Sequence, residues 1–325
     1  MSVFLGLDTS AYTTSLALMV EGEMNKREKM LEVKKGEKGL RQSEAVFQHQ
    51  NNLPFLFETL FNSPREIGKK DIKAVGASVS PRPVSGSYMP VFTVGSAFGR
   101  VIARVLDVDF FPTTHQENHL ACGLYSNDIL LEKFLAFHVS GGTTELLDVK
   151  YDPNKCEFIT DIVGGTQDLS AGQFIDRVGV MLGCEFPAGK ELEEMANKAD
   201  EASQVPIAVK GCNISFSGPL TYVQRKIEED KSKGNLNSGS IALGVFRSVA
   251  FSLEKLIFNA LSSKQKFKDI LFVGGVMSNT HIKNYLETEL KLKFDLNTWF
   301  TPPELSKDNG AGVAWITAQK YFTGF

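Results

Sequence analysis

The stretch VFLGLDTS at residues 3–10 is a short apolar run that ends in an acid and two hydroxyls. A second apolar run, TSLALM at residues 14–19, follows closely, so the two predict a hairpin of strands. The second half of the chain repeats this order, with a strand expected over 134–139, a tight turn over 140–143 and a strand over 144–149. The predicted fold class is therefore α/β with two duplicated lobes.

The elements after each hairpin are expected at intervals along the rest of the chain. Strands are expected over residues 74–79, 108–111, 158–163 and 270–273. Helices are expected over residues 91–106, 170–182, 219–229, 240–262, 279–290 and 308–321, with a further helical pattern from residue 42 that Pro54 is expected to interrupt. A hairpin with a polar turn at the head of each half resembles the actin, hexokinase and Hsp70 (ASKHA) fold. We expect a first lobe of residues 1–128 and 307–325, and a second of residues 129–306.

Length and composition are those of an ordinary globular protein. The 325 residues carry a net charge of −3, which argues against purely electrostatic binding of nucleic acid but leaves a local basic patch open. Residues 26–41 include 7 basic and 3 acidic side chains, and we expect a solvated loop that either contacts a phosphate backbone or is only a solvated edge. No apolar run has the length of a bilayer span, the start does not resemble a secretory signal, and the 4 cysteines match no zinc or disulfide pattern. A cytoplasmic protein without a membrane partner is expected.

The spacing of His115 and His119 is the strongest indication of a metal site in the sequence. If their segment is helical, residues four apart lie on one face, and two imidazoles then converge as a divalent metal requires. The alternative is two surface histidines without a ligand. Glu117 lies two positions from each histidine, not directly after the first, so the zinc-protease signature is absent.

Several loops have the composition of anion-binding turns. The turn Ser140-Gly141-Gly142-Thr143 combines glycines with hydroxyls after a strand, and glycines let backbone N–H groups approach a phosphate. Asp8-Thr9-Ser10 is its counterpart in the first half. Gly274-Gly275 before Asn279 is a third candidate. Each also fits an ordinary turn.

Two acidic residues have both a functional and a structural interpretation. Asp308, near the expected last helix, either completes the histidine site or caps that helix. Asp176 lies on a predicted helix beside Arg177 and also fits a surface ion pair.

Taken together, these stretches resemble the TsaD/Gcp family over almost the whole chain. That family comprises tRNA N6-threonylcarbamoyladenosine synthases, formerly called O-sialoglycoprotein endopeptidases, and this chain resembles a divergent paralogue. Seven short motifs in the expected order carry the resemblance: GLDTS at 6–10, HQENHLA at 115–121, VSGG at 139–142, AGQFID at 171–176, SFSG at 215–218, GGV at 274–276 and DNGA at 308–311.

The resemblance implies a set of roles for these residues. His115, His119 and Asp308 would hold one divalent metal, iron or zinc. ATP, AMP or threonylcarbamoyl-adenylate would lie against Ser140, Gly141, Gly142, Thr143, Asp176, Gly189 and Asn279. Asp8, Thr9 and Ser10 are the candidate catalytic residues. The implied reaction moves threonylcarbamoyl from its AMP anhydride to N6 of adenosine 37 in tRNA, with a smaller paralogue and a P-loop ATPase as partner proteins.

The chain departs from the family pattern in three loops. Family members follow the first Thr-Ser with Cys-Asp-Glu-Thr, where this chain has AYTT at residues 11–14. The phosphate turn continues TTE at 143–145 in place of His-Thr-Gln, and SPRP at 80–83 replaces Gly-Pro-Gly. Two carboxylates are thus missing beside the expected reacting centre, where a positioned base is worth about 10²–10⁴-fold in rate.

Three hypotheses follow from these observations. The first is a threonylcarbamoyl transferase acting on tRNA. The second is a divergent paralogue that binds metal and nucleotide but has another acceptor or a regulatory role. The third is a metal-dependent glycoprotease, which ranks last because no Glu directly follows His115.

Overall fold

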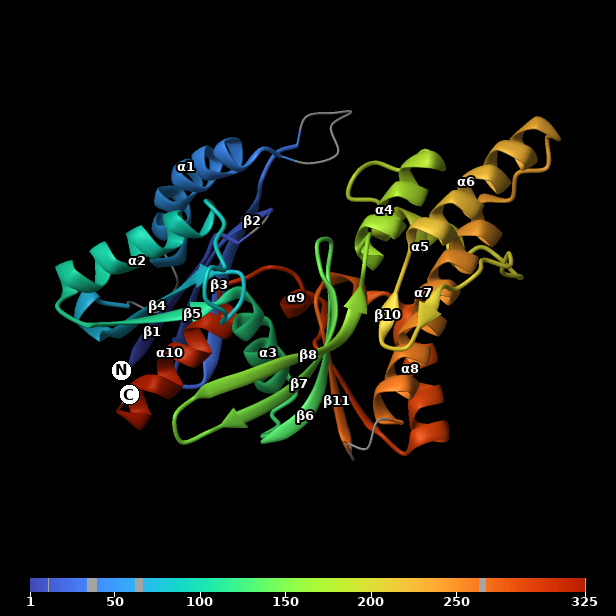
Figure 1. Cartoon of the computed structure of the whole chain (residues 1–325). Coiled ribbons are helices and arrows are strands. Elements are labelled where there is room, and N and C mark those ends of the chain that lie inside the picture. The colour runs from blue at the N-terminus through green and yellow to red at the C-terminus, as the bar shows by residue number, and fades with distance from the viewer. Residues whose placement is uncertain (11, 34–39, 62–66, 263–266, 325) are drawn as a thin grey trace. The chain divides into compact units, whose positions relative to one another are not determined.

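The computed structural model describes residues 1–10, 12–33, 40–61, 67–262 and 267–324 (Figure 1). They form two compact units. Unit 1 comprises Met1–Glu132, Tyr151–Ile159 and Glu304–Phe325, and unit 2 comprises Lys133–Lys150 and Thr160–Pro303. The lobe boundaries expected from the sequence stay a prediction.

Unit 1 is built on a five-stranded sheet. Its strands are β1 (Val3–Asp8), β2 (Thr13–Val20), β3 (Glu23–Met30), β4 (Ile72–Ser80) and β5 (Asp109–Thr114), in the order β3-β2-β1-β4-β5. The first three strands pair antiparallel, whereas β1 with β4 and β4 with β5 are parallel. The hairpin expected from the opening stretch is confirmed, with Val3 opposite Val20 and Asp8 opposite Ser15.

The alternation of side chains along β1 assigns a helix layer to each face of this sheet. Val3, Leu5 and Leu7 share a core with α1 (Gln42–Phe61) and α2 (Phe92–Leu106). Phe4 packs with Ala318 of α10 (Ala311–Thr323), which lies on the opposite face beside α3 (His115–Ser126). Because successive side chains of a strand point to opposite faces, the even-numbered Asp8 belongs to the α3 and α10 side.

A seven-stranded sheet, most of whose residues belong to unit 2, repeats the same order. The strands are β6 (Lys133–Val139), β7 (Thr144–Asp152), β8 (Glu157–Thr166), β9 (Val209–Lys210), β10 (Asn213–Ile214), β11 (Asp269–Val273) and β12 (Asn297–Phe300). The order is β12-β11-β6-β7-β8-β10-β9. The series β8-β7-β6-β11-β12 matches β3-β2-β1-β4-β5, with an antiparallel β6–β7 pair and parallel β6–β11 and β11–β12 pairs. The duplication predicted from the two hairpins is confirmed.

The helices of unit 2 bury one face of its sheet. They are α4 (Ala171–Met181), α5 (Gly189–Ala196), α6 (Ser217–Ser232), α7 (Ser238–Leu261) and α8 (Thr280–Phe294). Leu135, Phe137 and Val139, alternate residues of β6, join a core with α4, α6, α7 and α8. The α7 helix is buried at positions such as Val245, Val249 and Leu253, which recur every four residues on one face.

Three expectations about local structure are wrong. Pro54 lies inside α1, which continues through it. Residues 26–30 belong to strand β3 and not to a solvated loop, while residues 34–39 of that expected loop lie outside the described part of the chain. The last helix begins at Ala311 and not at Asp308, because the short helix α9 (Pro303–Ser306) and a loop precede it. The sequence patterns also missed the helices α5 and α9 and the strands β3, β9, β10 and β12.

Among the described residues, no helix has both the length and the apolar character needed to cross a membrane. All four cysteines are described and carry free thiols. Burial raises the pKa of Cys122 to about 12 and that of Cys156 to about 11, so neither thiol is a ready nucleophile.

Candidate functional site

The start of α3 determines where the two histidines of the pair lie. Thr114 caps the helix by accepting a hydrogen bond from the backbone N–H of Glu117, at 3.2 Å. The Glu117 carboxylate in turn accepts from the Thr114 N–H at 2.8 Å. This reciprocal cap begins the helix at His115, so His119 follows one turn later on the same face. The same hydrogen bonds hold the Glu117 side chain at the N-terminus of α3.

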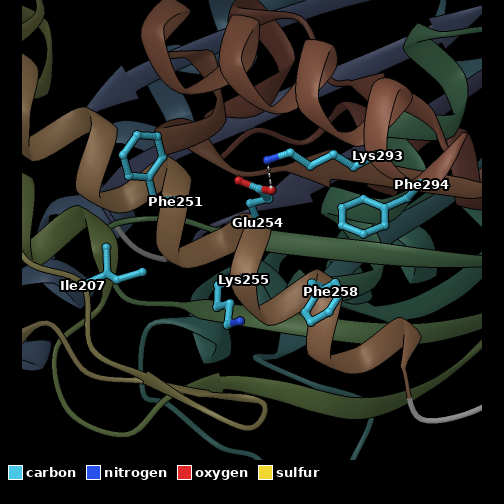
Figure 2. Close-up of a pocket in the computed structure, with 7 residues that line it drawn as sticks. All are labelled: Ile207, Phe251, Glu254, Lys255, Phe258, Lys293 and Phe294. Carbon is cyan, nitrogen blue, oxygen red and sulfur yellow. Dashed lines mark hydrogen bonds and ion pairs between the residues drawn. The ribbon is translucent and has the colours of Figure 1, made fainter.

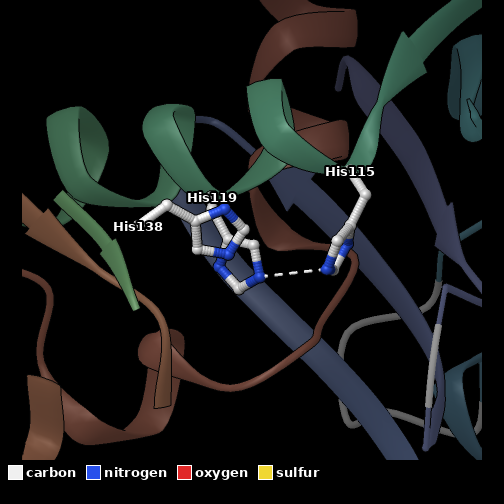
Figure 3. Close-up of side chains that lie close together, drawn as sticks. All are labelled: His115, His119 and His138. Atoms are coloured by element: carbon white, nitrogen blue, oxygen red, sulfur yellow. Dashed lines mark hydrogen bonds between the residues drawn. The ribbon is translucent and has the colours of Figure 1, made fainter. Parts of the chain in front are cut away.

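His115, His119 and Asp308 bring three candidate ligand atoms together in unit 1. Figure 3 shows the side chains of His115 and His119, one turn apart on α3. The two Nε2 atoms lie 3.2 Å apart. Each of them lies 3.4 Å from Oδ1 of Asp308. The N-cap of α10 is Gly310, so the alternative role of Asp308 as a helix cap is wrong.

This triangle fits a divalent cation by its size and its donor chemistry. Metal–ligand distances of about 2.0–2.1 Å at tetrahedral angles place neighbouring ligand atoms about 3.3–3.4 Å apart. The three edges of 3.2, 3.4 and 3.4 Å lie close to that spacing. Two imidazole nitrogens with one carboxylate oxygen are donors that both zinc and iron accept.

The charges around the histidines are strongly coupled. Burial by itself lowers the pKa of an imidazole, but the carboxylates of Asp8 and Asp308 outweigh it and raise the pKa of His115 to about 10. The pKa of His119 is lowered, by burial first and then by His115. Burial would raise the pKa of Asp308, yet hydrogen bonds from both imidazoles hold it well below its usual range. One positive charge is thus held where a cation would bind.

The three candidate catalytic residues have different surroundings. Asp8 is fully buried, and its Oδ2 accepts a hydrogen bond from Nδ1 of His115 at 3.2 Å. Its Oδ1 has no hydrogen-bond partner among the described residues, and neither has the buried Oγ of Ser10. The Thr9 hydroxyl donates to the Val91 carbonyl and accepts from the Gly95 N–H, so it anchors the start of α2. Their assignment as catalytic residues stays a prediction.

Two buried asparagines near the metal triangle were missed by the sequence reasoning. Asn118 lies in α3 between the two histidines, and Asn309 directly follows Asp308. In the sequence, these two asparagines could have been found only as polar residues on the inner face of their segments. Asn118 donates to Asp8 and to the Asn309 carbonyl, which joins the separate segments of the cluster.

In unit 2, the turn Ser140–Thr143 lies against the start of α4. The Ser140 N–H donates to the Thr143 carbonyl, and the Thr143 N–H donates to the Ser140 hydroxyl. Ser170, the cap of α4, donates to the Gly141 carbonyl at 2.6 Å. A Cβ on Gly141 or Gly142 would meet nothing within 4 Å, so the space over the turn is open. A glycine turn beside a helix N-terminus suits a phosphate group.

Asn279 follows β11 in the same unit, and β11 pairs in parallel with β6. Its Oδ1 caps α8 by accepting from the Ile282 N–H at 3.0 Å. Its Nδ2 is buried without a hydrogen-bond partner among the described residues. Gly274 has φ +96°, and a Cβ there would lie 2.4 Å from the Val139 carbonyl, so this loop meets the strand that leads into the Ser140 turn. The Nδ2 group of Asn279 is thus available to donate a hydrogen bond to an acceptor group of a ligand.

Asp176 and Gly189 meet each other through a helix start. The Asp176 carboxylate accepts from the Ala188 N–H at 2.9 Å and from the Gly189 N–H, at the beginning of α5. Burial raises the pKa of Asp176 above its ordinary value. Asp176 and Arg177 are both described, and no ion pair joins them. The interpretation of Asp176 as one partner of a surface ion pair is therefore not supported. Their role toward a nucleotide stays a prediction.

A separate cavity of ≈ 560 Å³ is lined mostly by residues of α7 and α8 (Figure 2). Its lining residues are Ile207, Phe251, Glu254, Lys255, Phe258, Lys293 and Phe294. Lys293 pairs with Glu254 at 2.7 Å inside it. None of the residues assigned to the nucleotide lines this cavity.

Comparison with known proteins identifies the fold and the family. Component A of the (R)-2-hydroxyglutaryl-CoA dehydratase of Acidaminococcus fermentans aligns over 100% of both chains with a TM-score of 0.59 at 16% identity. HypF of T. kodakarensis aligns over 99% of this chain and 48% of its own length, with a TM-score of 0.57 at 15% identity. These likenesses concern the fold, and the protein is an α/β protein of the ASKHA class.

The family model for TsaD, tRNA N6-adenosine threonylcarbamoyltransferase, matches residues 23–315, and the chain belongs to this family. A tRNA N6-adenosine threonylcarbamoyltransferase of Prochlorococcus marinus is 31% identical over 293 residues, covering 85% of this chain and 77% of the relative. The protein of the same name from Thermus thermophilus is 28% identical and covers 99% of this chain and 94% of the relative. The resemblance stated from the seven motifs is confirmed.

Proposed function

We propose that this chain transfers a threonylcarbamoyl group from its AMP anhydride to N6 of adenosine 37 in tRNA. The observation that carries the proposal is the triangle of His115, His119 and Asp308 in a chain whose relatives are named as this transferase. Such a cluster has the donor set of a metal site, and the family supplies the reaction.

The metal would be held by His115, His119 and Asp308. When bound, a divalent cation supplies Lewis-acid polarisation of the carbonyl and a template for the anhydride oxygens. Asp8 accepts the N–H of His115 and thereby directs its other nitrogen to the site. The same donor set is compatible with iron and with zinc.

The nucleotide part of the substrate would lie in unit 2. The open turn Ser140–Thr143 at the start of α4 offers backbone N–H groups for a phosphate. The unpartnered Nδ2 of Asn279 offers a donor for a second acceptor group. AMP, ATP and threonylcarbamoyl-adenylate all carry such groups. A smaller paralogue and a P-loop ATPase are proposed as partner proteins, and tRNA as the acceptor.

A second candidate function is a metal- and nucleotide-binding protein with another acceptor or a regulatory role. The observation in its favour is the loop after Ser10, where Tyr12 and Thr13 stand in place of two acids. Tyr12 is 37% exposed, and its neighbour Ala11 lies outside the described residues. A metal-dependent glycoprotease is the weakest candidate, because Glu117 is engaged in capping α3.

Complementation separates these functions. The chain is expressed in cells depleted of their own synthase, and threonylcarbamoyladenosine is measured in digested tRNA by mass spectrometry. The first proposal expects the modified nucleoside to return with the wild-type chain and with His281→Ala, a control histidine in α8, but not with His115→Ala. Soluble wild-type chain that restores no modification would favour the second candidate.

A further inference from the structure

Asn118 occupies a central position in the buried part of unit 1. Its side chain is 1% exposed and lies in α3, three residues after His115 and one before His119. Its Nδ2 donates to Oδ2 of Asp8 at 2.7 Å and to the Asn309 carbonyl at 2.6 Å. Its Oδ1 accepts from the Val313 N–H of α10 at 3.0 Å. Both amide protons and the amide oxygen are therefore used.

These three hydrogen bonds join segments that are far apart in the sequence. Asp8 ends β1, Asn309 follows the candidate ligand Asp308, and Val313 lies in the first turn of α10. Asn309 secures the same loop from the other side, because its Nδ2 donates to the carbonyls of Leu305 and Lys307. The loop that carries Asp308 is thus tied to the helix that carries both histidines.

Asp8 continues this chain of contacts to His115. A carboxylate only accepts hydrogen bonds at neutral pH, so Nδ1 of His115 carries the proton in its 3.2 Å contact with Oδ2. Nε2 therefore faces His119 and Asp308, and it is the nitrogen that would release its proton to bind a cation. The same Oδ2 accepts from Asn118, which fixes the carboxylate in the position that His115 requires.

We propose that Asn118 is a positioning residue of the metal site, because its carboxamide ties the Asp8 carboxylate that orients His115 to the loop that presents Asp308. The inference rests on the metal site of the proposed function, but not on the acceptor of the reaction. Partners that orient metal ligands typically contribute about 10–100-fold in metal affinity.

The test measures metal affinity in the full chain, independent of catalysis. Stripped protein is titrated with Co²⁺, whose visible absorption reports ligand geometry, and with Zn²⁺ against a chelating dye. Asn118→Asp keeps the oxygen that serves Val313 but places a carboxylate oxygen against Asp8 and the Asn309 carbonyl. We expect a loss of affinity of about 10–100-fold and an altered Co²⁺ spectrum.

The matched control is Asn52→Asp. Asn52 is 6% exposed in α1 of the same unit, and its Nδ2 donates to the Thr14 hydroxyl at 3.1 Å. We expect this variant to lose stability without a change in Co²⁺ affinity or spectrum. If both variants lose affinity equally, or if folded Asn118→Asp binds Co²⁺ as the wild type does, the proposal is overturned.

Asn118→Ala covers the case in which Asn118→Asp does not fold, since it removes both donated bonds and adds no charge. Weaker Co²⁺ binding by this variant supports the proposal, and unchanged binding overturns it. Wild-type chain that binds neither metal overturns both the metal site and this inference. Wild-type chain that binds metal but modifies no tRNA overturns only the proposed transfer reaction.

Discussion

Gly312 of α10 lies directly against the backbone carbonyl oxygen of Asn118 in α3. A Cβ built on Gly312 would come 2.1 Å from that oxygen and 2.5 Å from Oδ1 of the same asparagine. Only a residue without a side chain permits this approach of the two helices. Their contact brings the loop before α10, with Asp308, to the histidines of α3.

Gly312→Ala is therefore expected to disturb both stability and metal binding. The new methyl group must displace backbone, so we expect the free energy of unfolding to fall by about 1–3 kcal/mol. Metal affinity should fall with it, because Asp308 moves away from the imidazoles. Urea unfolding and Co²⁺ titration measure the two effects.

Gly218→Ala provides the comparison for that variant. Gly218 lies in the first turn of α6, where a Cβ would meet nothing within 4 Å. This change should leave metal affinity intact and stabilise the chain by up to about 1 kcal/mol. An unchanged unfolding free energy for Gly312→Ala would contradict the close approach of α10 to α3.

Purified protein is expected to retain one divalent metal per chain, and His115→Ala to remove it. The imidazole supplies one of three ligand atoms spaced 3.2–3.4 Å apart, so its truncation removes a ligand atom from the triangle. Elemental analysis after extensive dialysis measures the occupancy, with His281→Ala as the control. Equal occupancy in the wild type and in His115→Ala would refute the assignment of this ligand.

Gly141→Val is expected to weaken nucleotide binding while the fold remains intact. The added side chain meets nothing within 4 Å at its Cβ, so it enters the open space over the turn where a phosphate would lie. We expect about a tenfold loss of AMP or ATP affinity, or ~1.4 kcal/mol, by calorimetry. The thermal midpoint should stay near that of the wild type. Wild-type affinity in this variant would exclude the turn from the nucleotide site.

Asp168 is expected to make the stability of unit 2 depend on pH. Although burial acts in the opposite direction, its pKa is held well below the usual range by hydrogen bonds from the Ser215 hydroxyl and from the backbone of Phe216 and Ser217. A carboxylate with a lowered folded-state pKa stabilises the fold above its unfolded pKa of about 3.9, and this contribution is lost as pH falls through the folded-state pKa.

Asp168→Asn should accordingly cost about 1 kcal/mol at pH 7, a modest value because solvent screens this exposed side chain. The difference from the wild type should be constant above pH 5 and shrink in acid, as measured by urea unfolding at a series of pH values. Asp161→Asn, an exposed acid of β8, is the control. A difference that grows toward low pH would contradict the prediction.

Sequence patterns predicted those elements whose signals are local. The two hairpins, the buried strands β4 and β11, and helices such as α2 and α7 follow from alternation or helical spacing within one segment. The same patterns failed for the charged strand β3, because among the described strands it lies at the sheet edge beside β2, where charged side chains remain in solvent. They failed at Pro54 because packing of α1 on β2 and β3 holds the helix together despite the proline.

The three candidate metal ligands show the same difference between features that are local in the sequence and features that depend on packing. The spacing of His115 and His119 in one helix is a property of the sequence, since residues four apart share a face of any α-helix. The presence of Asp308 beside them depends on the packing of α10 against α3 across Gly312, which no local pattern contains. Asn118 is a comparable case, because three of its partners lie in β1, the loop before α10 and α10 itself.

The family, the duplicated hairpins and the candidate residues of both sites could be predicted from the sequence alone, because they depend on short motifs and their order. Which of those residues touch one another depends on the tertiary fold. In the folded chain, Asp8 accepts a hydrogen bond from His115, and Thr9 anchors the start of α2. The Nδ2 atom of Asn279 has no hydrogen-bond partner among the described residues. The physical reason is that hydrogen bonds and close backbone contacts between distant segments depend on how sheets and helices pack.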